Sequence, residues 1–269
     1  ASNGTSVEEF HAYCAKMQAT HPNTMVTLST HDTKRSDDVR ARLAVLSEMA
    51  SEFGEVLNRW SRRNNELRLA RKSGEFPDRN TEYMLYQTLI GAWPISIERT
   101  QEYMLKAVRE AKQKTSWTAN NAEFEGGLNK FIEAILRDVG FVTELEQFVE
   151  EVKHAGRLNS LAQTLMKHTA PGVPDLYQGG ELWDLSLVDP DNRRPVDFAP
   201  RQALAAADRP FRPRALLQSW TTGEIKAEVM RRLLRFRRAH AALFRDGGYA
   251  ALPLAGRFER HAAAFVRAA

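Results

Sequence analysis

The stretch TLSTHDTKRSDD, residues 27–38, places a dense group of ionisable side chains directly after a short run of β-branched residues. The pair His31–Asp32 ends that run, and Lys34 and Arg35 follow. In a (β/α)8 barrel, catalytic carboxylates lie where strands end, and the two neighbouring cations would keep Asp32 ionised. Alternatively, the stretch is only the start of a helix, because Ser36 to Asp38 are ordinary capping residues. We interpret 36–38 as a helix start and leave both interpretations open for Asp32.

Two short buried strands are predicted in a chain that otherwise reads as helical. The first covers 25–30, and the second lies within APGVPDLYQGG, residues 170–180, between proline and glycine breakers. Nearly everything from 37 to 168 has a helical period. Because each strand runs into a charged loop and two strands cannot close a sheet, they are typical of the last strands of a barrel.

Helices are also predicted at 6–20, 199–206, 211–219 and 222–240, and the tail from 248 onward is typical of β-strands. Ser6 and Glu9 have the spacing of a capping box. Since an isolated two-stranded sheet is marginally stable in water, we expect the chain to be cut within a longer β-domain.

Composition argues against several classes of protein. The 269 residues contain 38 Lys or Arg and 34 Asp or Glu, and a net charge of +4 does not call for a nucleic-acid partner. We interpret the basic run RRLLRFRR, 231–238, as the solvated face of an amphipathic helix. The single cysteine, Cys14, is expected to be a buried structural thiol. With no signal sequence and no apolar span of about 20 residues, we expect a cytoplasmic protein without membrane contact.

Two more polar stretches are candidates for a site. Tyr177, Glu181, Trp183 and Asp184 could line a sugar site, although packing is the better explanation for any single aromatic residue such as Tyr177 or Trp183. The loop VDPDNRRPVDF, 188–198, lacks the glycine and final glutamate of a calcium loop, so it is a salt-bridged or hydroxyl-binding loop. Its polar cluster consists of Asp189, Asp191, Asn192, Arg193 and Arg194.

Two cations, Lys167 and His168, end the long helix before the second strand. Their position is explained by the helix dipole, which favours positive charge at a helix C-terminus. No nucleotide-binding or paired-cysteine motif is present, and we expect neither a metal nor a cofactor.

Four stretches, in order, resemble one branch of the α-amylase superfamily, the maltooligosyl trehalose synthases. The superfamily pattern is a strand ending in His-Asp, and the extension THDTKRSDDVRAR is the more specific sign of the trehalose-forming branch. The other stretches are LYQTLIGAWP, KQKTSWTANNAEFEGGL and HTAPGVPDLYQGGELWDLSLVDPDNRRPVDF. The resemblance runs from about residue 6 to the end of the chain.

The resemblance implies an α/β fold that is mostly helical over these residues. The predicted strands at 25–30 and 173–178 would be strands seven and eight of a (β/α)8 barrel. The expected parts are 1–36, the end of the barrel; 37–168, a helical insertion; 169–240, strand eight and following helices; and 241–269, the start of a C-terminal β-domain.

The resemblance also implies a reaction, catalysed by a (1→4)-α-D-glucan 1-α-D-glucosylmutase. Such an enzyme converts the reducing-end α-1,4 linkage of a maltooligosaccharide into an α,α-1,1 linkage by intramolecular transglycosylation. Asp32 matches the carboxylate that stabilises the transition state, and His31 matches a histidine that binds the same sugar. Lys34 and Arg35 match the branch-specific extension that would hold the released glucose. Weaker candidates for substrate binding are Tyr177, Asp191 and Arg193.

The carboxylates that act as nucleophile and general acid in the superfamily lie on strands four and five, and nothing before residue 25 can supply these strands. We therefore expect the chain to be inactive alone and to be a monomer, with the missing N-terminal part of the same enzyme as its partner. Two alternatives stay open. One is another α-amylase-type hydrolase or glucanotransferase; the other is a non-catalytic helical interaction module.

Overall fold

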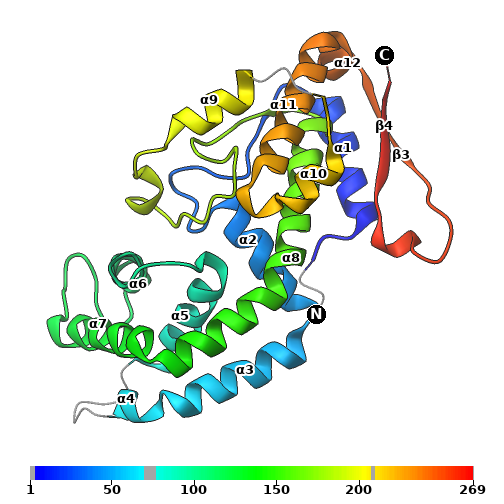
Figure 1. Ribbon diagram of the computed structural model, residues 1–269. Helices are drawn as coiled ribbons and strands as arrows, with labels where there is room; N and C mark the ends of the chain where they lie inside the picture. The colour runs from blue at the N-terminus through cyan, green and yellow to red at the C-terminus, as the bar shows by residue number, and fades with distance from the viewer. Residues whose placement is uncertain (1–3, 70–76, 207–209, 269) are drawn as a thin grey trace. The chain divides into compact units, whose positions relative to one another are not determined.

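Helices make up most of the chain in the computed structural model, which describes residues 4–69, 77–206 and 210–268 (Figure 1). The contacts divide it into two compact units. The first, here called the strand unit, comprises 1–30, 161–183 and 196–269; the second, the helical unit, comprises 31–160 and 184–195. The division falls between Thr30 and His31, inside the stretch 27–38.

The helical unit confirms the helical period predicted for 37–168. Its elements are α2 (Asp37–Ala44), α3 (Ala50–Arg63), α4 (Asn65–Leu69), α5 (Arg79–Ala92), α6 (Ile97–Ala111), α7 (Ala122–Arg137) and the first part of α8 (Val139–Thr169), with 3-10 turns η1 (Val45–Ser47) and η2 (Asp191–Arg193). From Leu161 onward, α8 belongs to the strand unit.

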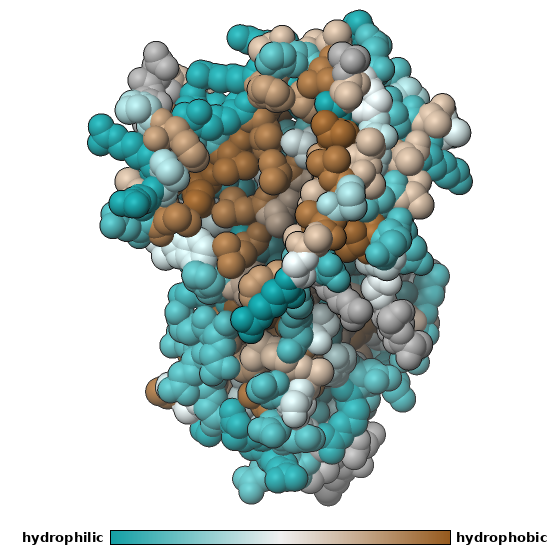
Figure 2. All heavy atoms as spheres, turned by 90° about the vertical axis from the view of Figure 1, so that its right-hand side faces the viewer, coloured by the Kyte–Doolittle hydropathy of each residue, from teal (hydrophilic) through white to brown (hydrophobic). Residues whose placement is uncertain are grey.

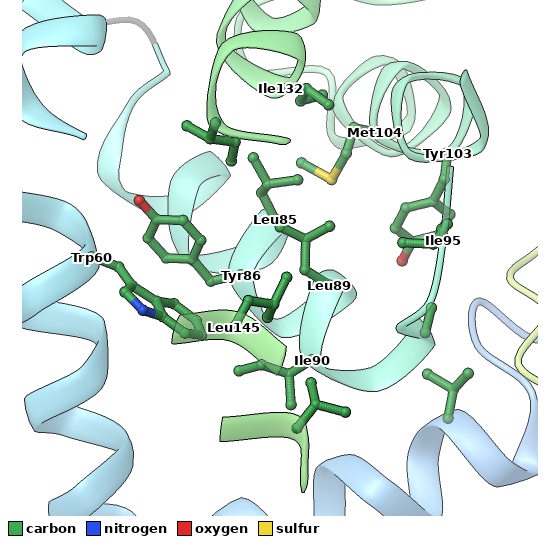
Figure 3. Close-up of a cluster of buried hydrophobic side chains, with 14 of the residues drawn as sticks. Trp60, Leu85, Tyr86, Leu89, Ile90, Ile95, Tyr103, Met104, Ile132 and Leu145 are labelled. Carbon is green, nitrogen blue, oxygen red and sulfur yellow. The ribbon is translucent and has the colours of Figure 1, made fainter. Parts of the chain in front are cut away.

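The core of the helical unit surrounds α5, whose Leu85, Tyr86, Leu89 and Ile90 are almost completely buried (Figure 3). Trp60 of α3 meets the Tyr86 ring edge-on at 5.4 Å between centroids. The Tyr86 hydroxyl donates to Glu82 Oε1 at 2.8 Å, so its polar end is satisfied inside the core. Aromatic contacts and satisfied polar groups together explain why this unit packs around α5.

The strand unit begins with α1 (Val7–Thr20), where the predicted capping box is confirmed. Glu9 N–H donates to Ser6 Oγ at 3.1 Å and Ser6 N–H donates to Glu9 Oε2 at 2.7 Å. The remaining elements are β1 (Met25–Val26), β2 (Val173–Pro174), α9 (Phe198–Ala206), α10 (Pro213–Gln218), η3 (Trp220–Thr222), α11 (Glu224–Ala239), α12 (Ala241–Asp246), β3 (Gly248–Leu252), η4 (Glu259–His261) and β4 (Ala264–Ala268).

Strands β1 and β2 pair in parallel, with Met25 opposite Val173 and Val26 opposite Pro174. Both are shorter than predicted, and Met25 is 67% exposed, so the predicted length and burial of these strands are wrong. A local hydrogen bond, from Thr27 Oγ1 to Ser29 O at 2.8 Å, offers the backbone an alternative to the ladder directly after β1.

The predicted β-strands of the tail are confirmed as the antiparallel pair β3–β4. This hairpin does not stand alone, because α1 packs against it (Figure 1). Phe10 of α1 lies 6.4 Å from Phe265 between ring centroids, and the Tyr249 hydroxyl lies 2.6 Å from His11 Nδ1.

Cys14 is 3% exposed on the same helix, which confirms a buried thiol, and burial raises its pKa. The short helix α12, ahead of β3, was not predicted.

The expectation for His168 is wrong, and the expectation of a solvated face at 231–238 holds only in part. His168 is fully buried, and burial lowers its pKa to about 4, so its ring is neutral at pH 7 and does not complement the helix dipole as a cation. In the run 231–238, Arg232, Arg235 and Arg238 are exposed as expected. Arg237 is the exception, because it donates to His168 O and Gly172 O, each at 2.9 Å. Gly172 has a φ of +116°, where a side chain would be strained.

Glu125 of α7 organises the loop between α6 and α7. Its carboxylate accepts hydrogen bonds from Arg109 Nε at 2.8 Å, Thr115 Oγ1 at 2.7 Å and Asn120 Nδ2 at 2.9 Å. The hydrogen bonds from Arg109 are the main reason that the pKa of Glu125 falls from 4.5 to about 2, against the opposing effect of burial.

Because the folded-state pKa is depressed, the stabilisation is present above pH 4.5 and is lost as pH falls toward 2. We expect the free energy of unfolding to fall by about 2 kcal/mol more between pH 5 and pH 2.5 in the unsubstituted protein than in Glu125→Gln. Urea unfolding at each pH measures this. Glu133→Gln, on the same helix and 46% exposed, should follow the unsubstituted protein. Parallel pH profiles for all three proteins would contradict the assignment.

Candidate functional site

The His31–Asp32 pair lies at the surface of the helical unit. His31 Nε2 is 3.3 Å from Asp32 Oδ2, and the side chains are 55% and 84% exposed. Both groups can therefore meet a solute without rearrangement.

The structure brings together the two charged loops, which are more than 140 residues apart in the sequence. Residues 31–36 run antiparallel to 186–189. Ser36 N–H donates to Ser186 O at 3.0 Å and Val188 N–H donates to Lys34 O at 3.2 Å. The His31 carbonyl accepts from Asp189 N–H at 3.3 Å and from Asn192 Nδ2 at 3.0 Å. We call these paired segments, 31–36 and 184–194, the paired loops.

A buried ion pair holds the second of the paired loops to α6. Arg99 donates from Nε to Asp191 Oδ1 at 2.7 Å and from Nη2 to Asp191 Oδ2 at 2.9 Å. Asp191 is 8% exposed and also accepts from Leu187 N–H at 2.7 Å. Burial raises the pKa of Asp191, but the hydrogen bonds from Arg99 and Leu187 outweigh it and leave the pKa below its usual value. Of the two predicted kinds of loop, the salt-bridged loop is confirmed.

Asp38 connects the paired loops to α8. It is 5% exposed, accepts from Asp184 N–H at 2.6 Å through Oδ2, and accepts from the Ser160 hydroxyl through Oδ1. Ser36 caps α2 by accepting from Val39 N–H, which confirms the predicted helix start, and its hydroxyl donates to Asp184 O at 2.6 Å. Ser36 and Asp38, which were expected only to cap α2, therefore also hold the segment 184–194 in place.

Lys34 and Arg35 each reach a helix of the helical unit. Lys34 Nζ lies 2.7 Å from Glu110 Oε2 on α6. Arg35 Nη2 donates to Thr88 Oγ1 on α5 at 3.3 Å. The chain turns after Asp32 so that these two cations face the helices.

The other candidates have different environments. Arg193 is 60% exposed and pairs with Asp189 Oδ1 at 2.5 Å. Tyr177 of the strand unit is half-buried, and its carbonyl accepts from Gly180 N–H in a turn. Glu181 pairs with Arg201 at 3.0 Å, and Trp183 Nε1 donates to Trp220 O at 2.6 Å, which favours packing for this indole. Asp184 accepts from Ser186 N–H at 3.0 Å within its own loop.

Three residues of α6 contribute to the site without having been singled out in the sequence. Arg99 donates to the Asp191 carboxylate, and Lys106 donates to Asp189 O at 2.6 Å. Glu110 accepts a hydrogen bond from Lys34. Their spacing of seven and four residues places them on one face of a helix, and this is the pattern that could have revealed them. Such a polar face is normally solvated, so the pattern does not identify its partner.

Removing one partner of the buried ion pair should lower the free energy of unfolding. We expect Arg99→Met to destabilise the protein by about 3 kcal/mol, because it removes the bidentate partner of the buried Asp191 carboxylate and leaves only the half-exposed Arg194 as its cation. The double variant Arg99→Met/Asp191→Leu should recover part of the loss. Arg193→Met removes an exposed charge of the same loop and should cost less than about 1 kcal/mol. Urea unfolding measures all three, and equal losses for Arg99→Met and Arg193→Met would contradict the prediction.

No helix among the described residues is both long and apolar enough to cross a lipid bilayer.

Comparison with known proteins confirms the resemblance noted in the sequence. A curated protein of Mycobacterium tuberculosis strain H37Rv, provisionally named maltooligosyl trehalose synthase, is 38% identical over 98% of this chain. A crystal structure of maltooligosyl trehalose synthase superposes with a TM-score of 0.86 at 32% identity over 97% of this chain. The synthase of Arthrobacter ramosus gives a TM-score of 0.79 at 38% identity, again over 97% of this chain. No family model matches.

The chain spans 32% of the length of the curated relative, and 35% and 33% of the two solved structures. It is a homologue of this portion of the synthases over nearly its whole length.

Proposed function

We propose that this chain, the homologue of about one third of a maltooligosyl trehalose synthase, carries part of the active site of such an enzyme. The reaction would convert the reducing-end α-1,4 linkage of a maltooligosaccharide into an α,α-1,1 linkage. The observation that carries the proposal is the exposed His31–Asp32 pair, held by the paired loops, in a chain that matches these synthases over 97% of its length.

In the proposed fold, β1 and β2 are strands seven and eight of a (β/α)8 barrel. Their parallel pairing supports this, because neighbouring barrel strands are parallel. Residues 37–168 would be a helical insertion between the two strands, 1–36 and 169–240 would belong to the barrel, and 241–269 would begin a β-domain. The paired loops would then lie at the carboxyl end of strand seven, where barrel enzymes place their sites.

The proposed chemistry is that of a retaining glycosidase. A carboxylate nucleophile attacks the anomeric carbon while a carboxylic acid gives its proton to the leaving glycosidic oxygen, and glucose is released. The 1-hydroxyl of that glucose then attacks the glycosyl-enzyme. Its proton returns to the second carboxylate, and the new 1,1 bond releases the nucleophile. Neither of these two carboxylates is assigned to this chain.

Asp32 would be the supporting carboxylate, whose negative charge stabilises the oxocarbenium-like transition state. Its exposure of 84% fits a group that becomes covered only by substrate and by other parts of the enzyme. His31 would donate to a hydroxyl of the same sugar, and its ring is kept near Asp32 at 3.3 Å. Both side chains rest on a backbone fixed by the two hydrogen bonds to the His31 carbonyl.

Lys34 and Arg35 would help to hold the released glucose, and Lys34 would have to leave Glu110 to do so. Arg193 has the exposed side chain that a sugar contact requires. Asp191 would keep its loop in position and would not contact the sugar, because both of its carboxylate oxygens accept hydrogen bonds from Arg99. Tyr177 remains a weaker candidate for a sugar contact.

The partner of this chain would be the N-terminal part of the same kind of enzyme. The strand unit exposes large apolar side chains, and Figure 2 shows a broad apolar area on one of its faces. The exposed apolar residues of this unit include Met25, Leu165, Met166, Val173, Leu252 and Val266. An exposed apolar area of this kind is typical of an interaction surface. We expect the chain alone to form no product.

Complementation tests the proposal. The chain is mixed with the part of a relative that precedes the matched portion, and maltopentaose is assayed for trehalose-ended product. We expect product from the mixture and none from the chain alone. Asp32→Asn should lower the rate in the mixture by about 10²–10³-fold, because it removes a charge aimed at the transition state. Asp246→Asn, at a carboxylate that is 61% exposed in the strand unit, should leave the rate unchanged. Full activity of Asp32→Asn would overturn the proposed role.

A further inference from the structure

The loop that joins α6 to α7 in the helical unit carries an exposed tryptophan, Trp117 (Figure 1). All five tryptophans of the chain are described, and Trp117 is 59% exposed, whereas the other four are buried or half-buried. It belongs to the stretch KQKTSWTANNAEFEGGL, which resembles the synthases but lies outside the paired loops. A single exposed aromatic residue is ordinary. The way in which the loop holds Trp117 is not.

Buried polar groups fix the backbone of this loop. Thr115 is 4% exposed, and its hydroxyl donates to Glu125 Oε1 at 2.7 Å. Directly after it, Ser116 N–H donates to Ala119 O at 3.0 Å, and Ala119 N–H donates to Ser116 Oγ at 2.9 Å. Trp117 lies inside the turn that these two hydrogen bonds close, so its backbone is in place before a ligand arrives.

Arg109 of α6 fixes the ring of Trp117. The guanidinium carbon lies 4.9 Å from the centroid of the ring, and a cation in this position is attracted to the aromatic face. The guanidinium is itself held, because it donates to Glu125 from Nε at 2.8 Å and from Nη2 at 2.5 Å. An aromatic ring held in this way loses little conformational entropy when a ligand covers its exposed surface.

The surroundings of the ring favour a carbohydrate over an apolar protein segment. The exposed neighbours in the loop carry amide, ammonium and hydroxyl groups; they are Gln113, Lys114, Thr118 and Asn120. The centre of a protein interface is depleted in charged residues, whereas a sugar presents an apolar ring face to an indole and hydroxyls to the polar groups around it. Within the described part of the chain, nothing accepts a hydrogen bond from the indole N–H of Trp117, so it can donate to a sugar hydroxyl.

The helix that holds Trp117 also reaches the proposed sugar site. Arg109 and Glu110 both lie near the end of α6, and Glu110 Oε2 is 2.7 Å from Lys34 Nζ. The same helix end therefore contacts Trp117 through one residue and Lys34 through the next.

We propose that Trp117 is a stacking platform for a glucose residue of a maltooligosaccharide, in addition to the contacts proposed for His31 and Asp32. The choice of this sugar rests on the proposed function, whereas the platform rests on the geometry of the loop. The test therefore measures binding to the chain alone and includes a variant at each of the two places.

Saturation-transfer NMR of maltoheptaose in the presence of the chain measures this binding. We expect saturable binding that Trp117→Ala weakens by at least about tenfold, because the apolar face of the indole is lost. Trp117→Phe should retain part of the affinity, since a smaller aromatic face remains. Tyr83→Ala, the matched control, removes a ring of the same unit that is 45% exposed and should leave the affinity unchanged.

Asp32→Asn separates this inference from the proposed function. If Asp32 binds no sugar, Asp32→Asn leaves the affinity unchanged while Trp117→Ala still weakens it, and the platform stands without the proposed site. Thermal unfolding of each variant confirms that folded proteins are compared.

Three results would overturn the platform. The first is the absence of saturable maltoheptaose binding, and the second is an equal loss of affinity in Trp117→Ala and Tyr83→Ala. The third is unchanged maltoheptaose binding in Trp117→Ala together with weaker association with the part of a relative that precedes the matched portion. That result would show that Trp117 contacts protein and not sugar.

Discussion

The buried pair of Arg99 and Asp191 is the interaction on which the organisation of the candidate site depends. Both charges lose most of their hydration, and such a loss is compensated only by close geometry and further hydrogen bonds. Here the pairing is bidentate, and the Leu187 amide and Arg194 complete the shell of the carboxylate. Asp191 thus fixes 187–194 to α6, and the backbone bonds from this loop to residues 31–36 fix the first loop in turn.

In this arrangement, the side chains that hold the paired loops differ from those that are exposed to a ligand. The groups that hold the paired loops, Asp38 and Asp191, are buried and fully engaged, whereas the groups available to a ligand, His31 and Asp32, are exposed. Sites built in this way keep the reactive backbone in place before a substrate arrives. Lys34 and Arg35 point toward α6 and α5, so the same loop presents an acid on one side and two cations on the other.

Most of the correct predictions from sequence rest on local patterns. The helices between 37 and 168, the capping box of Ser6 and Glu9, the cap at Ser36 and the β-hairpin of the tail follow from periodicity and capping chemistry. What could not be predicted depends on distant partners. The lengths of β1 and β2 depend on pairing across the chain, the neutral state of His168 depends on its burial, and Arg99 meets Asp191 across 92 residues.

The same limit applies to the candidate site. Sequence identified His31, Asp32 and the cluster at 189–194, and it offered a salt-bridged loop as one interpretation of the cluster. It did not show that the two loops pair, because no local pattern encodes hydrogen bonds from Asp189 and Asn192 to the His31 carbonyl. It also did not show that Lys34 reaches Glu110 of α6 and that Arg35 reaches Thr88 of α5, because these partners are distant in the sequence.

Amide hydrogen exchange on Asp191→Asn, compared with the unsubstituted protein and with Asp189→Asn as the control, tests most directly whether one buried ion pair holds both loops. The account predicts faster exchange at Ser36, Leu187, Val188 and Asp189 together in Asp191→Asn, with protection elsewhere in the helical core retained. Faster exchange confined to 187–189, with Ser36 still protected, would contradict it, as would an equal effect of Asp189→Asn.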